Sequence, residues 1–179
     1  MTLFDTHAHY DDEAFDADRD AVLSAFDGLV IDPGCTLASS QAAVDLAARH
    51  PHVYAAVGIH PENCGDFVPE HMDALRQLAQ QPKVVAIGEI GLDYYWAENP
   101  PREFQQQVLR AQLALALALD LPVIIHDREA HGDSLAIVKE YPALRGVFHC
   151  YSGSVEMARE LLHIAQPTLY KYLQEIKEE

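Results

Sequence analysis

The sequence predicts an α/β protein, a TIM-type (β/α) barrel with about six of the usual eight β/α units. Its β-rich runs recur at intervals of roughly 25 to 40 residues, and each is followed by a stretch long enough for a helix. The runs are almost continuously apolar, as strands of a parallel sheet covered on both faces must be. All but the second end in residues able to bind metal. A barrel gathers such strand ends at one mouth, whereas a doubly wound sheet spreads them along an edge, so the barrel is favoured.

The expected strands are, in chain order, TLFDTH, GLVIDPG, VYAAVGIHP, VVAIGEIG, PVIIHDR and GVFHCYS. The stretches between and after them are expected to be helical: EAFDADRDAVLSAF, ASSQAAVDLAARH, HMDALRQLAQQ, REFQQQVLRAQLALALALD, SLAIVKEY and SVEMARELLHIA. The longest of these helices should begin at about Asn99, which would serve as its N-cap ahead of Pro100, and should end at Pro122.

The chain is expected to divide into a partial barrel domain over residues 1–166 and an atypical helical tail over 167–179. In the tail, apolar residues fall at i, i+3, i+4 and i+7, which is typical of one face of an amphipathic helix. These residues are Leu169, Tyr172, Leu173 and Ile176.

Composition limits the classes of function. The 12 Lys and Arg residues against 28 Asp and Glu give a net charge of −16, which works against non-specific affinity for a polyanion. Nucleic-acid chemistry would therefore need a local positive feature, which bound metal ions could supply. No basic region precedes an apolar core at the N-terminus, and no stretch predicts a membrane span. Three cysteines without a C-x-x-C pair favour a reducing, cytoplasmic location.

The residues at the strand ends predict a metal site. His7 and His9 stand two residues apart, so their side chains point to the same side and can bind one ion. Glu89 follows five apolar strand residues, where a carboxylate needs a partner, and a carboxylate can bridge two ions. His126 and His149 would complete a second position. Each residue alone could be an ordinary core residue, but five of them at four strand ends favour a metal site. Two ions bound about 3.5 to 4 Å apart can stabilise the attacking and leaving oxygens of a displacement and lower the pKa of bound water, so the expected chemistry is hydrolysis.

The motifs FDTHAHYDD, GIHPEN, GEIGLDYYW, PVIIHDREAHGDSL and FHCYSGSVEMARELL resemble those of the TatD-type metal-dependent hydrolases, deoxyribonuclease-like members of the amidohydrolase superfamily. The resemblance runs from the N-terminus to about residue 162. It implies that His7 and His9 bind the first metal, that Glu89 bridges both, and that His126 and His149 bind the second.

The same resemblance implies roles at the substrate. His60 would lie near the scissile phosphate, so that Glu89 and His60 are the expected catalytic residues, and His60 and Arg128 would contact substrate. Two simpler alternatives stay open. His60 precedes a proline and could simply cap a loop. The sole role of Arg128 could be to form ion pairs with its acidic neighbours, Asp127, Glu129 and Asp133.

The resemblance also implies an activity, namely metal-dependent cleavage of phosphodiester bonds by a water molecule that the metal activates, typically at DNA ends. Mg, Mn or Zn would be the two divalent ions. Because the net charge disfavours binding of a long duplex, short or single-stranded DNA reached at its end is the expected substrate.

In one respect the sequence departs from the family. The family pattern continues to an eighth strand that ends in an aspartate, which completes the first metal site, and this chain has no counterpart to that aspartate. We therefore expect the first site to be weaker than the second and the activity to be impaired. Six strands without the closing two would also leave open edges, which invite pairing with another chain. Three explanations stay open: a gene truncated or frameshifted near Ile164, a chain that closes its barrel by self-association, and a partial barrel covered by the tail helix.

Two alternative functions are kept. The chain could be a non-catalytic remnant that binds metal or a partner, or it could be a hydrolase of another ester or of an amide.

Overall fold

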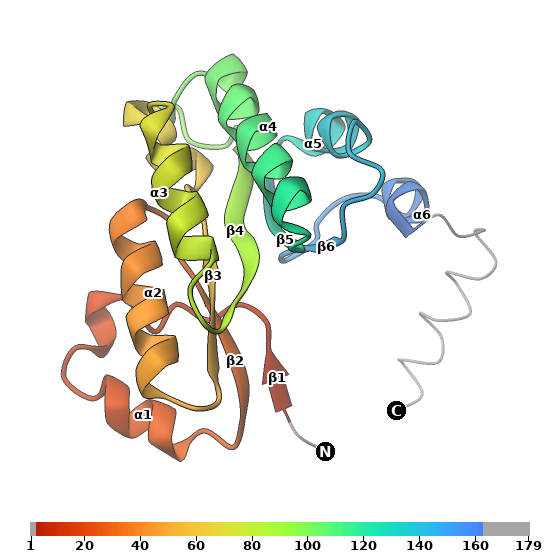
Figure 1. Ribbon diagram of the computed structural model, residues 1–179. Coiled ribbons are helices and arrows are strands. Elements are labelled where there is room, and N and C mark those ends of the chain that lie inside the picture. The colour runs from red at the N-terminus through yellow and green to blue at the C-terminus, as the bar shows by residue number, and fades with distance from the viewer. Residues whose placement is uncertain (1–2, 163–179) are drawn as a thin grey trace, which may run out of the picture.

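The computed structural model describes residues 3–162, which form one six-stranded parallel sheet curled into part of a TIM-type barrel (Figure 1). The strands lie side by side in chain order, so the predicted fold is confirmed. Their bounds are β1 Leu3–Asp5, β2 Gly28–Pro33, β3 Val53–Val57, β4 Val84–Asp93, β5 Val123–Arg128 and β6 Gly146–Phe148. The tail helix predicted for 167–179, and with it the boundary at residue 166, lies outside the described residues.

The strands are joined by helices that pack on the outer face of the curled sheet (Figure 1). The bounds of the α-helices are α1 Arg19–Ala25, α2 Leu37–Arg49, α3 Glu70–Ala79, α4 Arg102–Leu119, α5 His131–Val138 and α6 Val155–Leu162, with short 3-10 helices η1 at Glu13–Phe15 and η2 at Pro61–Asp66. The helix predicted from Asn99 begins later, because Pro101 is its N-cap. The Asn99 amide instead donates to the side chain and backbone of Asp93.

The core lies between the helices and one face of the sheet. On β3, the fully buried Val53, Ala55 and Val57 alternate with residues that face the other way. Helices α3 and α4 contribute buried leucines to the same core, among them Leu75 and Leu109. This outer layer fixes the strands, and through them the ends of the strands where polar residues gather.

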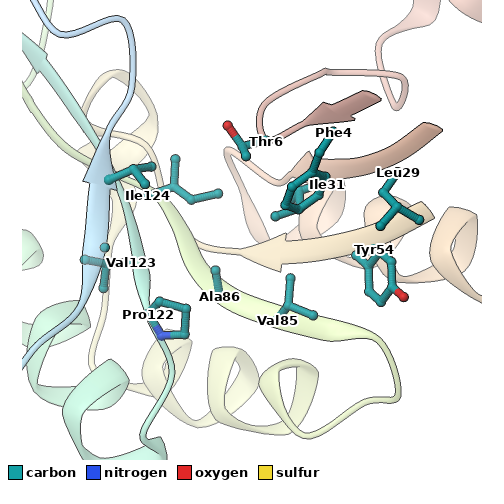
Figure 2. Close-up of a pocket in the computed structure, with 12 residues that line it drawn as sticks. Phe4, Thr6, Leu29, Ile31, Tyr54, Val85, Ala86, Pro122, Val123 and Ile124 are labelled. Atoms are coloured by element: carbon teal, nitrogen blue, oxygen red, sulfur yellow. The ribbon is translucent and has the colours of Figure 1, made fainter. Parts of the chain in front are cut away.

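The opposite, inner face of the sheet is a concave apolar surface, which Figure 2 shows. A hollow of about 380 Å³ lies over it. Among the residues that line the hollow are Phe4, Leu29, Ile31, Tyr54, Ala86 and Ile124. In a closed barrel this face would be filled by side chains from strands on the other side.

Both lateral strands of the sheet are short and expose apolar side chains. Phe4 on β1 is 56% exposed and Val147 on β6 is 46% exposed. Backbone groups on such edges can pair with another chain. Within residues 3–162, no helix has the length and apolar character needed to cross a membrane.

Among residues 3–162, the outer edges of β1 and β6 have no partner strand, and this predicts self-association. We expect sedimentation equilibrium to give a mass above that of one chain, and we expect Phe4→Lys combined with Val147→Lys to shift the protein to the monomer, because a charge on an edge strand opposes pairing. Leu117→Lys, on the exposed face of α4, is the matched control and should leave the mass unchanged. A wild-type protein that sediments as one chain at all concentrations would contradict the prediction.

Candidate metal centre

The two histidines of the H-x-H motif lie in the segment that follows β1. The backbone of this segment is tied to β2, because the Ala8 amide donates to the carbonyl oxygen of Ile31 at 3.1 Å. The His7 amide donates to Asp5 Oδ1 at 3.0 Å. The two rings meet edge to face, with Nε2 of His7 and Nε2 of His9 only 2.9 Å apart. Both imidazoles therefore present the same nitrogen to one point, as the sequence predicts.

The carboxylate at this point belongs to Glu89 on β4, which is 3% exposed. Its Oε2 lies 3.2 Å from His7 Nε2 and 3.6 Å from His9 Nε2. Glu89 was predicted near a strand end, but β4 continues to Asp93, with a shift of register against β5 between Ile87 and Ile90. This irregularity lies at the residue that carries the carboxylate. We call His7, His9 and Glu89 the first donor group.

The other oxygen of the same carboxylate faces a second set of imidazoles. Glu89 Oε1 lies 3.0 Å from His126 Nδ1, on β5, and 3.9 Å from His60 Nε2. We call His60, Glu89 and His126 the second donor group, and within each group the possible ligand atoms lie within 4.8 Å of one another. Glu89 thus turns one oxygen to each group, which is the arrangement of a carboxylate that bridges two cations.

His60 of the second donor group lies in the segment that follows β3. It is buried and is the N-cap of η2, where its Nδ1 accepts a hydrogen bond from the Glu62 amide at 3.3 Å. The loop-capping role is thus observed, and it leaves Nε2 of the same ring directed at Glu89. Burial, together with the neighbouring His126, lowers the pKa of His60 to about 4. The ring is therefore neutral at pH 7, and because Nδ1 acts as an acceptor, the ring proton lies on Nε2.

His149 and Arg128 lie beside these groups. The His149 ring stacks on the His7 ring with 3.5 Å between centroids, and neither donor group of the described residues includes it. Arg128 is exposed at the end of β5. Both residues line a pocket of about 300 Å³, together with His126, Asp127, Cys150 and Ser152.

The charges of the site favour a cation. Burial alone would raise the pKa of Glu89, but hydrogen bonds with His126, His7 and His9 outweigh it and hold that pKa far below its usual range. The hydrogen bond with Asp11, followed by that with Glu89, raises the pKa of His9 to about 10. The buried Glu89 carboxylate thus favours positive charge on the imidazoles around it. At such a site a divalent ion can take the place of the imidazole protons.

The donor set fits a metal ion. Two imidazole nitrogens 2.9 Å apart cannot both direct a proton at each other, so a shared proton or a cation must satisfy them. Imidazole nitrogen and carboxylate oxygen are ligands that Zn and Mn accept. The geometry therefore allows an ion at each of the two groups.

Sequence reasoning missed Asp93, the residue that fixes His126 from the other side. Asp93 is fully buried at the end of β4, and its Oδ2 lies 3.0 Å from His126 Nε2. Its Oδ1 accepts from the Tyr95 amide at 2.9 Å and from Asn99 Nδ2 at 3.0 Å. Asp93 lies in the motif GEIGLDYYW, but nothing in the sequence shows which strand-end carboxylate binds a metal and which one orients a ligand. Such carboxylate–histidine contacts orient metal ligands.

A second overlooked carboxyl group is Asp32, on the only strand for which no metal-binding residue was predicted. Asp32 is fully buried at the end of β2, and neither of its carboxylate oxygens has a hydrogen-bond partner among residues 3–162. Burial, followed by the neighbouring charge of Asp11, raises its pKa to about 8. Asp11 also faces His9, with Oδ1 3.8 Å from Nδ1. Two carboxyl groups thus lie behind His9.

Comparison with known proteins gives a consistent family. Residues 4–170 match the family model described as TatD related DNase. The chain is 38% identical over 166 residues to the uncharacterized metal-dependent hydrolase YabD of Bacillus subtilis, an alignment that covers 89% of this chain and 65% of YabD. It is 36% identical over 159 residues to the 3'-5' ssDNA/RNA exonuclease TatD of Salmonella typhimurium, covering 85% of this chain and 60% of that protein.

Solved structures agree. The crystal structure of the TatD homolog YJJV from Escherichia coli superimposes with a TM-score of 0.82 at 35% identity, over 90% of this chain and 64% of that one. A TatD family hydrolase from Entamoeba histolytica gives a TM-score of 0.81 at 25% identity, over 91% of this chain and 62% of that one. The chain spans about 60 to 65% of the length of YabD and of the Salmonella TatD.

The buried Asp32 predicts a pH dependence of stability. Its pKa in the folded protein, about 8, lies above its ordinary value of 3.8, so the folded state keeps a proton that the unfolded state loses in this range. The free energy of unfolding should therefore fall as the pH rises from about 4 to about 8. Asp32→Asn cannot ionise, and we expect urea denaturation of metal-free protein at pH 8 to show it about 2 kcal/mol more stable than wild type.

The gain from Asp32→Asn should shrink as the pH falls and should vanish below the unfolded pKa of 3.8, where both states hold the proton. Asp27→Asn, at an exposed position, is the control and should follow the wild-type curve. Parallel pH profiles for wild type and Asp32→Asn would show that the Asp32 carboxyl group is ionised in the folded protein.

Proposed function

This chain belongs to the TatD related DNase family, and we propose that it is a metal-dependent hydrolase that cleaves phosphodiester bonds at the ends of single-stranded nucleic acid. The observation that carries the proposal is the pair of donor groups that share Glu89. One relative is named a 3'-5' ssDNA/RNA exonuclease, which supports the substrate class. The net charge of −16 supports a substrate reached at its end rather than along a basic groove.

The proposed ligands are His7, His9 and Glu89 at one position and Glu89 and His126 at the other. His149 was expected from the sequence as a ligand of the second ion, and it is kept as a ligand candidate because its ring lies against His7 and lines the adjoining pocket. Divalent ions, when bound, supply stabilisation of negative charge on the phosphate oxygens and lower the pKa of water toward about 7. Mg, Mn or Zn can take this part, and the imidazole-rich donor set favours Mn or Zn over Mg.

The protein's own groups orient and hold the substrate. Glu89 stays ionised because its imidazole neighbours lower its pKa, so it can face positive charge on both sides. His60, neutral at pH 7, accepts from the Glu62 amide through Nδ1 and therefore carries its proton on Nε2, where it can donate to a phosphate oxygen. Arg128, at the edge of the same pocket, presents a guanidinium group that suits phosphate.

A non-catalytic, metal-binding role is the second candidate, and one observation favours it. Among residues 3–162, the first donor group has Glu89 as its single carboxylate, so its ion would be held by fewer anionic ligands than the family pattern provides. Activity on another ester or on an amide stays a further alternative. We keep the cytoplasm as the proposed location, since all three cysteines are free.

Two experiments test the proposal: removal of the metal with a chelator and removal of the Glu89 carboxylate by substitution. We expect metal-loaded protein to hydrolyse bis(p-nitrophenyl) phosphate and to shorten single-stranded DNA from an end, and we expect a chelator to abolish both activities. Glu89→Gln keeps the shape of the side chain but loses the charge, so its rate should fall by at least about 100-fold and its metal content should fall with it.

Glu70→Gln, at an exposed position on α3, is the matched control and should keep the wild-type rate and metal content. Metal-replete wild type that cleaves neither substrate would overturn the hydrolase proposal. So would Glu89→Gln with unchanged rates.

A further inference from the structure

The loop after β4 carries two exposed aromatic side chains beside the candidate metal centre. Tyr95 is 52% exposed and Trp96 is 44% exposed, although large aromatic residues usually bury more of their surface. Their rings meet edge to face with centroids 4.6 Å apart. The Arg128 guanidinium lies over both, 4.1 Å from the Tyr95 ring centroid and 5.3 Å from that of Trp96. We call these three residues the aromatic platform.

The aromatic platform is built onto the metal centre through Asp93. One oxygen of the Asp93 carboxylate faces His126 Nε2 at 3.0 Å, and the other accepts from the Tyr95 amide at 2.9 Å. Asp93 also pairs in register with Arg128 across β4 and β5, and the Tyr94 amide donates to the Arg128 carbonyl oxygen at 2.9 Å. The backbone that carries the aromatic rings is therefore tied, through Asp93, to the imidazole of His126 in the second donor group.

The guanidinium of Arg128 is available for a ligand. The sequence suggested Asp127, Glu129 and Asp133 as its partners, but within residues 3–162 no carboxylate lies within 4.0 Å of it. Asp127 instead accepts from His131 and Ser134, and Asp133 accepts from Tyr94 and Gln106. Arg128 thus has no carboxylate partner among these residues, and it lines a pocket together with His126 and His149.

We propose that Tyr95 and Trp96, held against Arg128, stack on the bases of a single nucleic-acid strand whose terminal phosphodiester group lies at the metal centre. Every base offers a π face, so stacking binds a strand without a preference for sequence. A chain with a net charge of −16 repels a polyanion and must gain affinity from contacts other than a basic groove. A duplex hides its base faces, so the platform selects single strands. This inference rests on the proposed function for the placement of the scissile group.

Trp96 is the sole tryptophan of the chain, so it reports directly on stacking. The probe is a single-stranded thymidine octamer with phosphorothioate linkages, which resist hydrolysis, and its partner is an abasic octamer with the same backbone. We expect the thymidine octamer to quench the Trp96 fluorescence and to bind at least about tenfold more tightly than the abasic octamer. Because the platform offers one cation, affinity should fall only weakly with salt.

Variants locate the contact. By anisotropy of a fluorescein-labelled octamer, the double variant Tyr95→Ala with Trp96→Ala should bind about tenfold or more weakly, down to the level of the abasic strand. Trp96→Phe keeps a stacking ring and should retain most of the affinity, which separates stacking from a folding defect. Leu117→Ala removes an apolar side chain of similar exposure at the far end of α4 and should bind like wild type.

Equal binding of the thymidine and abasic octamers, binding without a change in Trp96 fluorescence, or no binding of either octamer would overturn the platform. Hydrolysis of bis(p-nitrophenyl) phosphate, which has no nucleobase, reports on the proposed function separately. Hydrolysis by wild type with equal binding of the two octamers refutes the platform alone. Base-dependent quenching without hydrolysis of any phosphodiester supports the platform and refutes the proposed function.

Discussion

The burial of one carboxylate, that of Glu89, constrains the whole strand-end region. A charged group that is 3% exposed loses its hydration and must recover the cost from positive or hydrogen-bonding partners. Here the partners are imidazoles from three other segments of the chain, namely His7 and His9 after β1, His60 after β3 and His126 on β5. Parallel strands that curl toward a common mouth bring these segments together, and the packing of the helices on the outer face holds the curl.

The same constraint connects the metal centre to the surface around it. His126 lies between Glu89 on one side and Asp93 on the other, and Asp93 also holds the backbone of the loop with the exposed aromatic residues. The end of β4 thus orients both the candidate metal ligand His126 and the loop that we propose to contact substrate. On the opposite side, Asp11 and Asp32 lie behind His9, so the imidazoles of both donor groups are flanked by buried carboxyl groups.

Much of the fold could be predicted from the sequence, because apolar runs of strand length alternate with amphipathic stretches and each signal is local. The six strands and the outer helices appear in the predicted order. The helix expected over 13–26 is instead divided into η1 and a shorter α1, and α5 begins at His131, three residues before its predicted start. The sequence predicts the ends of helices less well than their presence. Asn99 looked like an N-cap, but its amide is used by Asp93, and the helix begins after Pro101. The surroundings of His149 and Asp32 depend on how the strands curl and on where the loops cross, and a single sequence does not show either property.

The central claim is that Glu89 joins two metal positions. Electron paramagnetic resonance of protein loaded with Mn²⁺, with the metal content measured on the same sample, tests it most directly. The account predicts two ions per chain and the spectrum of a magnetically coupled pair, because ions that share one carboxylate lie a few ångströms apart. One ion per chain with the spectrum of an isolated Mn²⁺, or two ions without coupling, would contradict it.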